Sequence, residues 1–500
     1  MKLRALGWLG VGALLVWAAY VSPALAILGA FATVVAFGLF VTPKFALGAI
    51  ALFLAIQPLL VNLAGTSLTP LWLALHRLHQ AFAVAAVVRV AFFLGEAKLR
   101  RWLWLTTAFL AAGLTSALVA RVPLQTMVLG AFLAVKFQVF LLLALTIPWD
   151  ERDCARIMRV ALWLGPLLLA SGVLLWLAPA AVQNLFIDTT LEGGGVVLRE
   201  GLNPMQGIFS HPGVFGWAMA ITGCYALAAL LTSRTAWPAG PTVSLGASVL
   251  GILASLRRKP LVALPLAALY GVMRFATGRR RWAVLALFAV LAGGGAVLVT
   301  NRLEAEYRDA LNYVDPQGAT MPRVLLYVTG VQIANARFPL GAGFGRFGGY
   351  ASTLDYSPLY DEYGLSRVYG LTPEEPMYVL DTYWPHIAAE TGWLGAAMLL
   401  AFLLLLVLDA SRVARAAVDP ATKALAVGAA LALLEGLVES AAGPVFEVSL
   451  FAFAIAVPLG ISLVRSAERP PVAGAAPASA DVPSRPWPGA GPGPLPASPR

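Results

Sequence analysis

Residues 393–408 read WLGAAMLLAFLLLLVL, and no charged side chain interrupts this run, which belongs to an apolar segment that begins near residue 384. A helix needs about 20 apolar residues to cross the hydrocarbon core of a bilayer, and segments of this kind recur along nearly the whole chain. The sequence lacks the alternating ten-residue segments that are typical of a lipid-facing barrel. It therefore predicts an all-α polytopic membrane protein.

The composition of the 500-residue chain agrees with a protein that is solvated mostly by lipid. Hydrophobic residues make up 59% of the chain and charged residues 12%, whereas soluble domains are about a quarter charged. The mean hydropathy is +0.79. The net charge of +10 is explained by Lys and Arg in cytoplasmic loops, so we do not expect nucleic acid as a partner. The two cysteines, Cys154 and Cys224, indicate neither a disulfide nor a metal site.

We predict about 12–14 transmembrane helices from the lengths of the apolar segments. The candidate spans have the approximate limits 5–20, 24–41, 45–64, 74–95, 102–120, 125–147, 157–178, 212–232, 241–256, 260–276, 282–300, 384–408, 421–440 and 446–464. The first span could also be a signal peptide, but the second apolar run follows it so closely that a retained span is favoured.

Basic residues determine the predicted orientation. The connections 98–101, 152–159, 274–281 and 412–423 are rich in Lys and Arg, and all four fall on the same side of the membrane. Since Lys and Arg collect in cytoplasmic loops, we predict a multi-pass membrane protein with both termini in the cytoplasm. The transmembrane domain covers residues 1–465 in this topology.

Two regions differ from the apolar pattern. Residues 466–500 are rich in Pro, Ala and Gly and cannot bury a core, so they are predicted to form a disordered cytoplasmic tail. Residues 301–383 form one large extracytoplasmic loop, in which a helix is predicted from Pro322 to about Arg337. The G-x-G-x-x-G stretch at 343–348 opens no strand–turn–helix unit; its glycines favour a tight turn and the close approach of a ligand.

The triplet Arg257-Arg258-Lys259 contradicts the positive-inside pattern, because the predicted topology puts this short connection on the outer side. A miscounted span is one explanation. The other is an anion site, in which Arg guanidinium groups bind a diphosphate in a bidentate manner and Lys adds a point charge.

Further polar side chains are predicted on the same outer side. They are Arg199, His211, Arg323, Arg346 and Asp381. Glu435 and Glu439 lie four residues apart and therefore share one face of the predicted span 421–440. Ionisable residues in a span normally face a bundle interior or an aqueous cavity, although Glu439 could also lie at the membrane interface. No histidine has metal-ligand spacing, so we expect neither a metal nor a cofactor.

Four stretches resemble the O-antigen ligase and polysaccharide polymerase superfamily, in the same order along the chain. Residues 323–347 resemble its large-loop signature of an Arg, an amphipathic helix and P-L-G-x-G-x-G-x-F. Residues 207–213 look like its G-x-F-x-H-P-N element, with Gly213 in place of Asn. Residues 258–264 are similar to its S-R-K-x-L-L-A-L element, and residues 389–395 to its A-E-x-G-x-x-G span.

The resemblance implies a metal-independent membrane glycosyltransferase of the bacterial cytoplasmic (inner) membrane that uses an undecaprenyl-diphosphate-linked glycan. Ligases carry a His about nine residues before the Glu of the last element, and this position, counted back from Glu390, is Asp381. His386 lies five residues later. The Asp favours a polymerase, which joins oligosaccharide repeat units into O-antigen, capsule or exopolysaccharide. Ligation of the glycan to another acceptor, a transporter or flippase for the same lipid, and a non-enzymatic scaffold are the alternatives.

The predicted mechanism assigns a role to each candidate residue. Arg258 and Arg323 neutralise the charge that develops on the leaving diphosphate, and Asp381 acts on the acceptor hydroxyl; these three are the predicted catalytic residues. The predicted substrate-binding residues are Arg199, His211, Arg257, Lys259, Arg346 and Glu439. Membrane lipids, chain-length regulators and export proteins are the further expected partners. We expect Asp381→Asn to inactivate the protein and His386→Ala to be tolerated.

Overall fold

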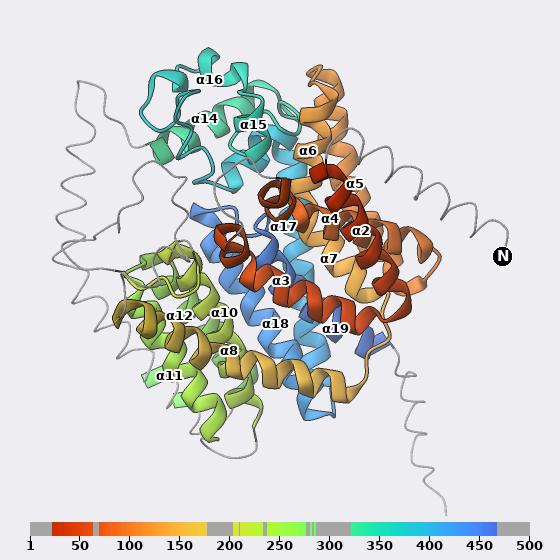
Figure 1. Ribbon diagram of the computed structural model, residues 1–500, viewed down its shortest axis with the longest axis vertical. Coiled ribbons are helices and arrows are strands. Elements are labelled where there is room, and N and C mark those ends of the chain that lie inside the picture. Colours follow the sequence, from red (N-terminus) through yellow and green to blue (C-terminus); the bar gives the residue numbers. More distant parts are fainter. Residues whose placement is uncertain are drawn as a thin grey trace, which may run out of the picture.

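The computed structural model describes residues 23–63, 70–177, 204–209, 211–233, 238–276, 281–282, 285–286 and 322–467. This part of the chain is built from helices and contains no strand, as predicted (Figure 1). The first predicted span, most of the predicted span 282–300, the first part of the large loop and the tail after Ala467 lie outside the described residues.

Most helices begin and end within a few residues of the predicted spans. The first half of the chain forms α2 (Pro23–Val41), α3 (Pro43–Leu63), α4 (Pro70–Phe92), α5 (Ala97–Val119), α6 (Leu124–Ala134), α7 (Lys136–Leu145), α8 (Glu151–Leu177), α10 (Pro212–Thr232) and α11 (Ala239–Ala254). The second half forms α12 (Arg258–Phe275), α14 (Pro322–Ala336), α15 (Tyr350–Leu354), α16 (Pro358–Glu362), α17 (Trp384–Ala416), α18 (Pro420–Glu439) and α19 (Ser449–Ala467). The described residues also form two short 3₁₀ turns, η1 (Leu365–Arg367) and η2 (Ser440–Ala442).

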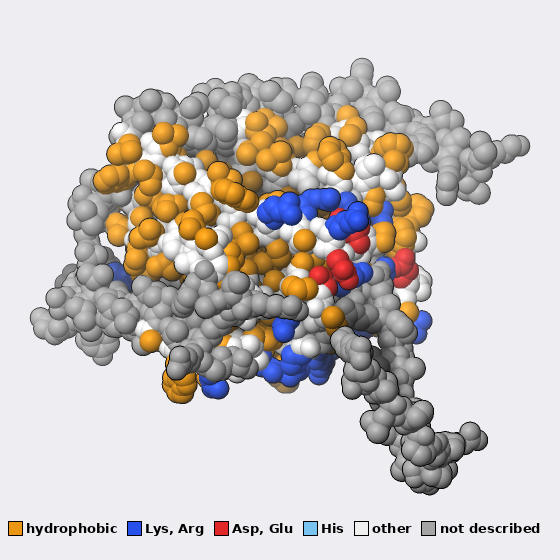
Figure 2. Space-filling model, turned by 90° about the horizontal axis from the view of Figure 1, so that it is seen from below, with side chains coloured by type: hydrophobic (Ala, Val, Ile, Leu, Met, Phe, Trp, Pro, Cys, Tyr) orange, Lys and Arg blue, Asp and Glu red, His pale blue; other side chains and the backbone are white. Residues whose placement is uncertain are grey.

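Five described helices are long and apolar enough to cross a membrane: α5, α8, α10, α17 and α18 extended to Ala442. The pair α6 and α7 adds a sixth if it counts as one span, although the two helices meet at 54°. The sequence predicted one continuous helix here, and the break at Val135 was not expected. Hydrophobic side chains cover much of the surface in Figure 2, which agrees with lipid exposure. The chain is thus a membrane protein, and the count of 12–14 spans stays a prediction.

Helix α18 is the centre of the bundle and packs against α10, α12, α17 and α19 (Figure 1). Nearly all of its side chains between Thr422 and Gly436 are buried, and many are Ala or Gly. Small residues allow helix backbones to approach closely, which is how helices associate in a membrane. Gly428 shows this, because a Cβ atom there would lie 2.4 Å from the ring of Tyr225.

The region from α14 to α16 sits at one end of the bundle (Figure 1). Helix α14 begins at Pro322 and ends at Ala336, as predicted. The following glycines turn the chain tightly: Gly343 and Gly345 have φ values of +92° and +82°, which favour glycine. A Cβ at Gly343 would lie 2.4 Å from Cα of Ala117, and one at Gly345 would lie 2.5 Å from the carbonyl oxygen of Thr126. The close approach at these two glycines is therefore made by the protein's own helices α5 and α6, whereas the sequence suggested a ligand.

Candidate functional site

The Arg257-Arg258-Lys259 triplet directly follows the tight turn from α11 and begins α12. Leu256 has a φ of +52°, and Arg257 is the residue that precedes the first turn of α12. Nη2 of Arg257 lies 3.0 Å from Nε2 of His211. His211 itself precedes α10, where its Nδ1 accepts a hydrogen bond from the backbone N–H of Gly213. The starts of α10 and α12 thus lie side by side, and two predicted binding residues are in contact.

Arg323 and Asp381, two of the predicted catalytic residues, form an ion pair. Nη2 of Arg323 donates to Oδ2 of Asp381 at 2.5 Å, and Nε donates to the backbone carbonyl of the same residue at 3.3 Å. The side chains are 44% and 37% exposed, respectively. Arg323 lies in the first turn of α14 and Asp381 lies three residues before α17. The pair is open to solvent on one side and held by two helices on the other.

Lys259 connects this ion pair to the triplet. Its ammonium group interacts electrostatically with Arg257, Arg323, Asp381 and Glu439. We call His211, Arg257, Lys259, Arg323, Asp381 and Glu439 the polar cluster. Its members come from the ends of several helices that are far apart in the sequence, and sequence reasoning had selected each of them.

The η2 turn after α18 accepts hydrogen bonds from two side chains at the polar cluster. Nζ of Lys259 donates to the carbonyl of Ala442, and the Tyr327 hydroxyl donates to the carbonyl of Ala441. Partial burial raises the pKa of Tyr327, while the nearby charge of Arg323 acts in the opposite direction. Both donors lie on helices that carry predicted site residues. The exposed carbonyls at this helix end therefore help to fix the cationic side of the cluster.

Glu439 and Trp217 close the inner side of the cluster. Glu439 is 1% exposed, and the Trp217 indole lies beside its carboxylate, although neither carboxylate oxygen makes a regular hydrogen bond with another described residue. Lys259 lies 5.6 Å from the centre of the Trp217 ring, a cation–π distance. The burial of this carboxyl group answers the question that the sequence left open: Glu439 faces the bundle.

Three predicted residues remain outside the cluster. Arg258 is part of the same turn and is half-buried. No hydrogen bond or ion pair joins Arg346 to the cluster among the described residues, and its buried Nε has no partner there. Arg199 lies outside the described residues. The structure therefore brings six of the nine predicted residues together in the polar cluster and places Arg258 next to them in the chain, whereas Arg346 is not joined to the cluster.

A second polar network surrounds His386 at the start of α17. Nε2 of His386 lies 2.9 Å from Oε1 of Glu447, and Nδ1 lies 2.5 Å from the carbonyl of Phe347. Glu390, one turn further along, accepts a hydrogen bond from the backbone N–H of Phe347 at 3.0 Å. His386 is only 4% exposed. With these contacts its removal is expected to destabilise the fold, contrary to the tolerance predicted from the sequence.

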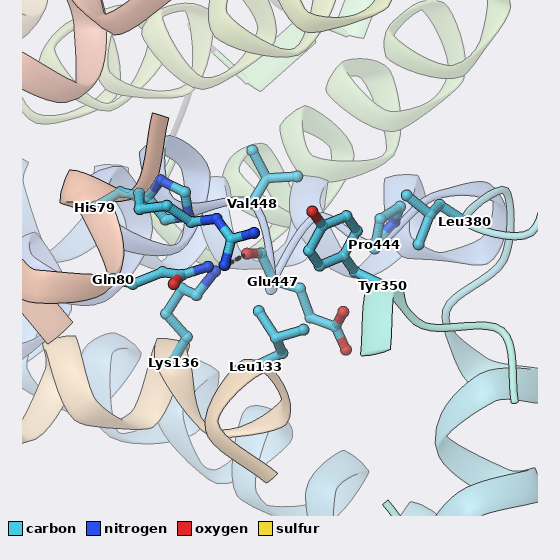
Figure 3. Close-up of a pocket in the computed structure, with 10 residues that line it drawn as sticks. His79, Gln80, Leu133, Lys136, Tyr350, Leu380, Pro444, Glu447 and Val448 are labelled. Atoms are coloured by element: carbon cyan, nitrogen blue, oxygen red, sulfur yellow. Dashed lines mark hydrogen bonds between the residues drawn. The ribbon is translucent and has the colours of Figure 1, made fainter. Parts of the chain in front are cut away.

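The network borders a cavity of about 220 Å³. Figure 3 shows side chains from α4, the α6–α7 break and the segment after η2 around it, with Lys136 donating to the backbone carbonyl of Glu447 at 2.7 Å. Tyr350 and Leu380 complete the wall from the loop side. Leu380 precedes Asp381, so the cavity adjoins the polar cluster along the chain.

Sequence reasoning passed over Lys136 and Glu447, although a signal was present. Lys136 lies in the middle of the predicted span 125–147, and Glu447 lies at the start of the span 446–464. An ionisable residue inside a membrane helix is costly and is a functional candidate by default. The contacts with His386 required the folded structure, because 61 residues separate it from Glu447.

The chain matches no protein-family model, and no curated protein is significantly similar to it. The polar cluster combines cations that suit phosphate oxygens with a half-exposed carboxylate that can accept a proton. This combination suits the displacement of a phosphorylated leaving group by a hydroxyl.

Proposed function

We propose that this chain polymerises polyprenyl-diphosphate-linked oligosaccharide repeat units into a cell-surface polysaccharide on the outer face of the cytoplasmic membrane. The observation that carries the proposal is the convergence of Arg323, Asp381 and Lys259 at one end of the helix bundle. Glycan transfer from a lipid diphosphate needs cations for the leaving group and a base for the acceptor. The resemblance of residues 323–347 to the large-loop signature of polysaccharide polymerases supports the same reaction.

The donor half of the proposed reaction depends on the cations. Arg258, Lys259 and Arg323 bind the diphosphate, with Arg257 beside them. As the bond between the anomeric carbon and the diphosphate oxygen breaks, negative charge grows on the leaving group. Preorganised cations stabilise this charge more in the transition state than in the ground state, which is what lowers the barrier. The polyprenyl diphosphate then leaves with the electron pair of the broken bond.

The acceptor half depends on Asp381. The acceptor hydroxyl oxygen forms the new bond to the anomeric carbon, and its proton passes to the Asp381 carboxylate. Before the donor binds, Arg323 occupies this carboxylate. A diphosphate that takes the guanidinium of Arg323 releases the carboxylate for the acceptor, so donor binding prepares the base.

The test is chain growth in proteoliposomes supplied with a polyprenyl-diphosphate oligosaccharide. Asp381→Asn keeps the size of the side chain but removes the proton acceptor, so chain growth should fall by about 10²–10⁴-fold while donor binding is retained. Asp361→Asn is the matched control, since Asp361 is an exposed aspartate on α16 in the same region and should leave chain growth unchanged. Normal chain growth in Asp381→Asn contradicts the proposal.

A ligase reaction through His386 is less well supported. Its ring is buried and both nitrogens face Glu447 and Phe347, whereas a base must reach the acceptor hydroxyl. A transporter is the other rival, and the same proteoliposomes distinguish it: movement of the lipid-linked glycan across the bilayer without chain growth favours transport.

A further inference from the structure

The cavity beside the polar cluster has a wall with two cationic side chains, Arg77 and Lys136. His79 and Gln80 from α4 and Lys136 from the start of α7 lie on one side of the cavity (Figure 3), and Arg77 of α4 also lines it. Lys136 is 2% exposed. The opposite wall is formed by Tyr350 and Leu380, which come from the segment between α14 and α17. The cavity is thus lined by charge on one side and by an aromatic ring and an aliphatic side chain on the other.

The positive charge of this wall has little compensation among the described residues. Lys136 donates one hydrogen bond, to the backbone carbonyl of Glu447. No carboxylate oxygen of a described residue lies within 4 Å of its ammonium nitrogen to form an ion pair. Arg77 and Gln80 have no hydrogen bond or ion pair with any other residue that the structure describes. A buried charge is costly unless it is paired. The wall is therefore suited to an anion that is supplied from outside the chain.

Glu447 is the nearest candidate for compensation, but its carboxylate is engaged elsewhere. Oε1 lies 2.9 Å from Nε2 of His386. In Figure 3 the carboxylate of Glu447 points away from Lys136, while its backbone carbonyl receives the lysine hydrogen bond. The buried His386 partner holds the acid in this direction. The carboxyl group of Glu447 therefore leaves the cationic wall open to a ligand.

The dimensions and lining of the cavity favour one sugar ring. Its volume of about 220 Å³ is below the roughly 300–1,000 Å³ of pockets for drug-sized ligands. Gln80 offers both a donor and an acceptor to hydroxyl groups. Tyr350 offers an aromatic face and a hydroxyl (Figure 3).

We propose that this cavity binds an acidic sugar residue of the acceptor glycan, with the sugar carboxylate between Lys136 and Arg77. The acceptor role rests on the proposed function, whereas the binding of an acidic sugar does not. Leu380 lines the cavity and Asp381 follows it directly, so a glycan anchored here brings a neighbouring hydroxyl towards the proposed base. The polymer would then contain uronic acid, and the carboxylate would select the acceptor.

Binding can be measured without turnover on the purified full-length protein in detergent. Saturation-transfer NMR with glucuronate should show a bound sugar, with glucose at least tenfold weaker and inorganic phosphate unable to displace glucuronate. Arg77→Gln and Lys136→Met should each weaken glucuronate binding by roughly ten- to a hundredfold, as expected for a charge-assisted hydrogen bond. Lys136→Met keeps the length of the side chain and removes a buried charge, so the fold should tolerate it.

Two control variants separate the outcomes. Arg101→Gln removes a cation of α5 that pairs with Asp409 in the last third of α17, and it should leave glucuronate binding unchanged. Arg323→Ala should also bind glucuronate normally while it loses chain growth. Sugar binding and chain growth are therefore tested independently, and a failure of the polymerase proposal does not count against the binding of an acidic sugar. Equal binding of glucose, displacement by phosphate, or unchanged affinity in both cavity variants overturns the assignment of an acidic sugar.

Discussion

Replacement of Arg323 by Ala should abolish turnover and leave the fold almost unchanged. Among the described residues Arg323 makes two hydrogen bonds, both to Asp381, and both side chains are more than a third exposed. Exposed ion pairs contribute about 0–1 kcal/mol to stability, because water and salt screen them. We therefore expect the free energy of unfolding to fall by at most about 1 kcal/mol. In the proposed reaction the same side chain faces the leaving diphosphate, where losing one donor costs about 2.7–4 kcal/mol, or roughly a hundred- to a thousandfold in rate.

Chain growth in proteoliposomes and thermal unfolding in detergent should be measured on the same preparations. Arg101→Ala is the matched control, because Arg101 of α5 forms an ion pair of the same 2.5 Å length with Asp409, and Asp409 lies towards the end of α17 that is far from Asp381. It should retain both stability and chain growth. Arg323→Lys should recover only part of the rate, since Lys supplies charge without the bidentate geometry. A rate loss in Arg323→Ala that is matched by a loss of folded protein refutes the reasoning, and so does a normal rate.

Three further predictions test the surroundings of the site. His386→Ala should lower the thermal unfolding temperature and cost about 3–5 kcal/mol, because two buried carboxylates lose their partner; an unchanged unfolding temperature contradicts this. Gly345→Ala should destabilise the fold, since a Cβ would collide with α6, whereas Gly48→Ala, with nothing within 4 Å, should be neutral; equal stability of the two variants speaks against the packing described. An impermeant thiol reagent should label a cysteine at the exposed position Glu374 in intact spheroplasts and one at Val418 only after permeabilisation, and the reverse pattern would invert the predicted topology.

The helices could be predicted well from the sequence because lipid and a close-packed core impose a simple apolar pattern. The predicted span 212–232 coincides with α10, and a Pro start was enough to locate α14. Helix α17 continues to Ala416, eight residues beyond its predicted end, because helical hydrogen bonding does not stop where the apolar run stops. No proline at the break between α6 and α7 indicates it in the sequence. Helix α6 packs against the segment with Gly343 and Gly345, and this tertiary contact cannot be predicted from a local pattern.

The sequence identified the residues of the polar cluster but not the contacts between them. Positive charge on the wrong side of the predicted membrane pointed to Arg257 and Lys259, and the spacing before Glu390 pointed to Asp381. That Asp381 pairs with Arg323 follows from the placement of α14 against α17, which no local pattern encodes. Arg346 was selected with the same logic, yet the glycine turns direct its segment towards α5 and α6.

The most direct measurement of the central claim counts products in sealed proteoliposomes that contain only this protein and a polyprenyl-diphosphate oligosaccharide. The proposed mechanism predicts that the glycan grows by whole repeat units and that one polyprenyl diphosphate is released for each new glycosidic bond, without added nucleotide sugar. Chain growth should depend on Asp381 and Arg323. Intact donor with no released diphosphate, in vesicles that hold folded protein, would contradict the account.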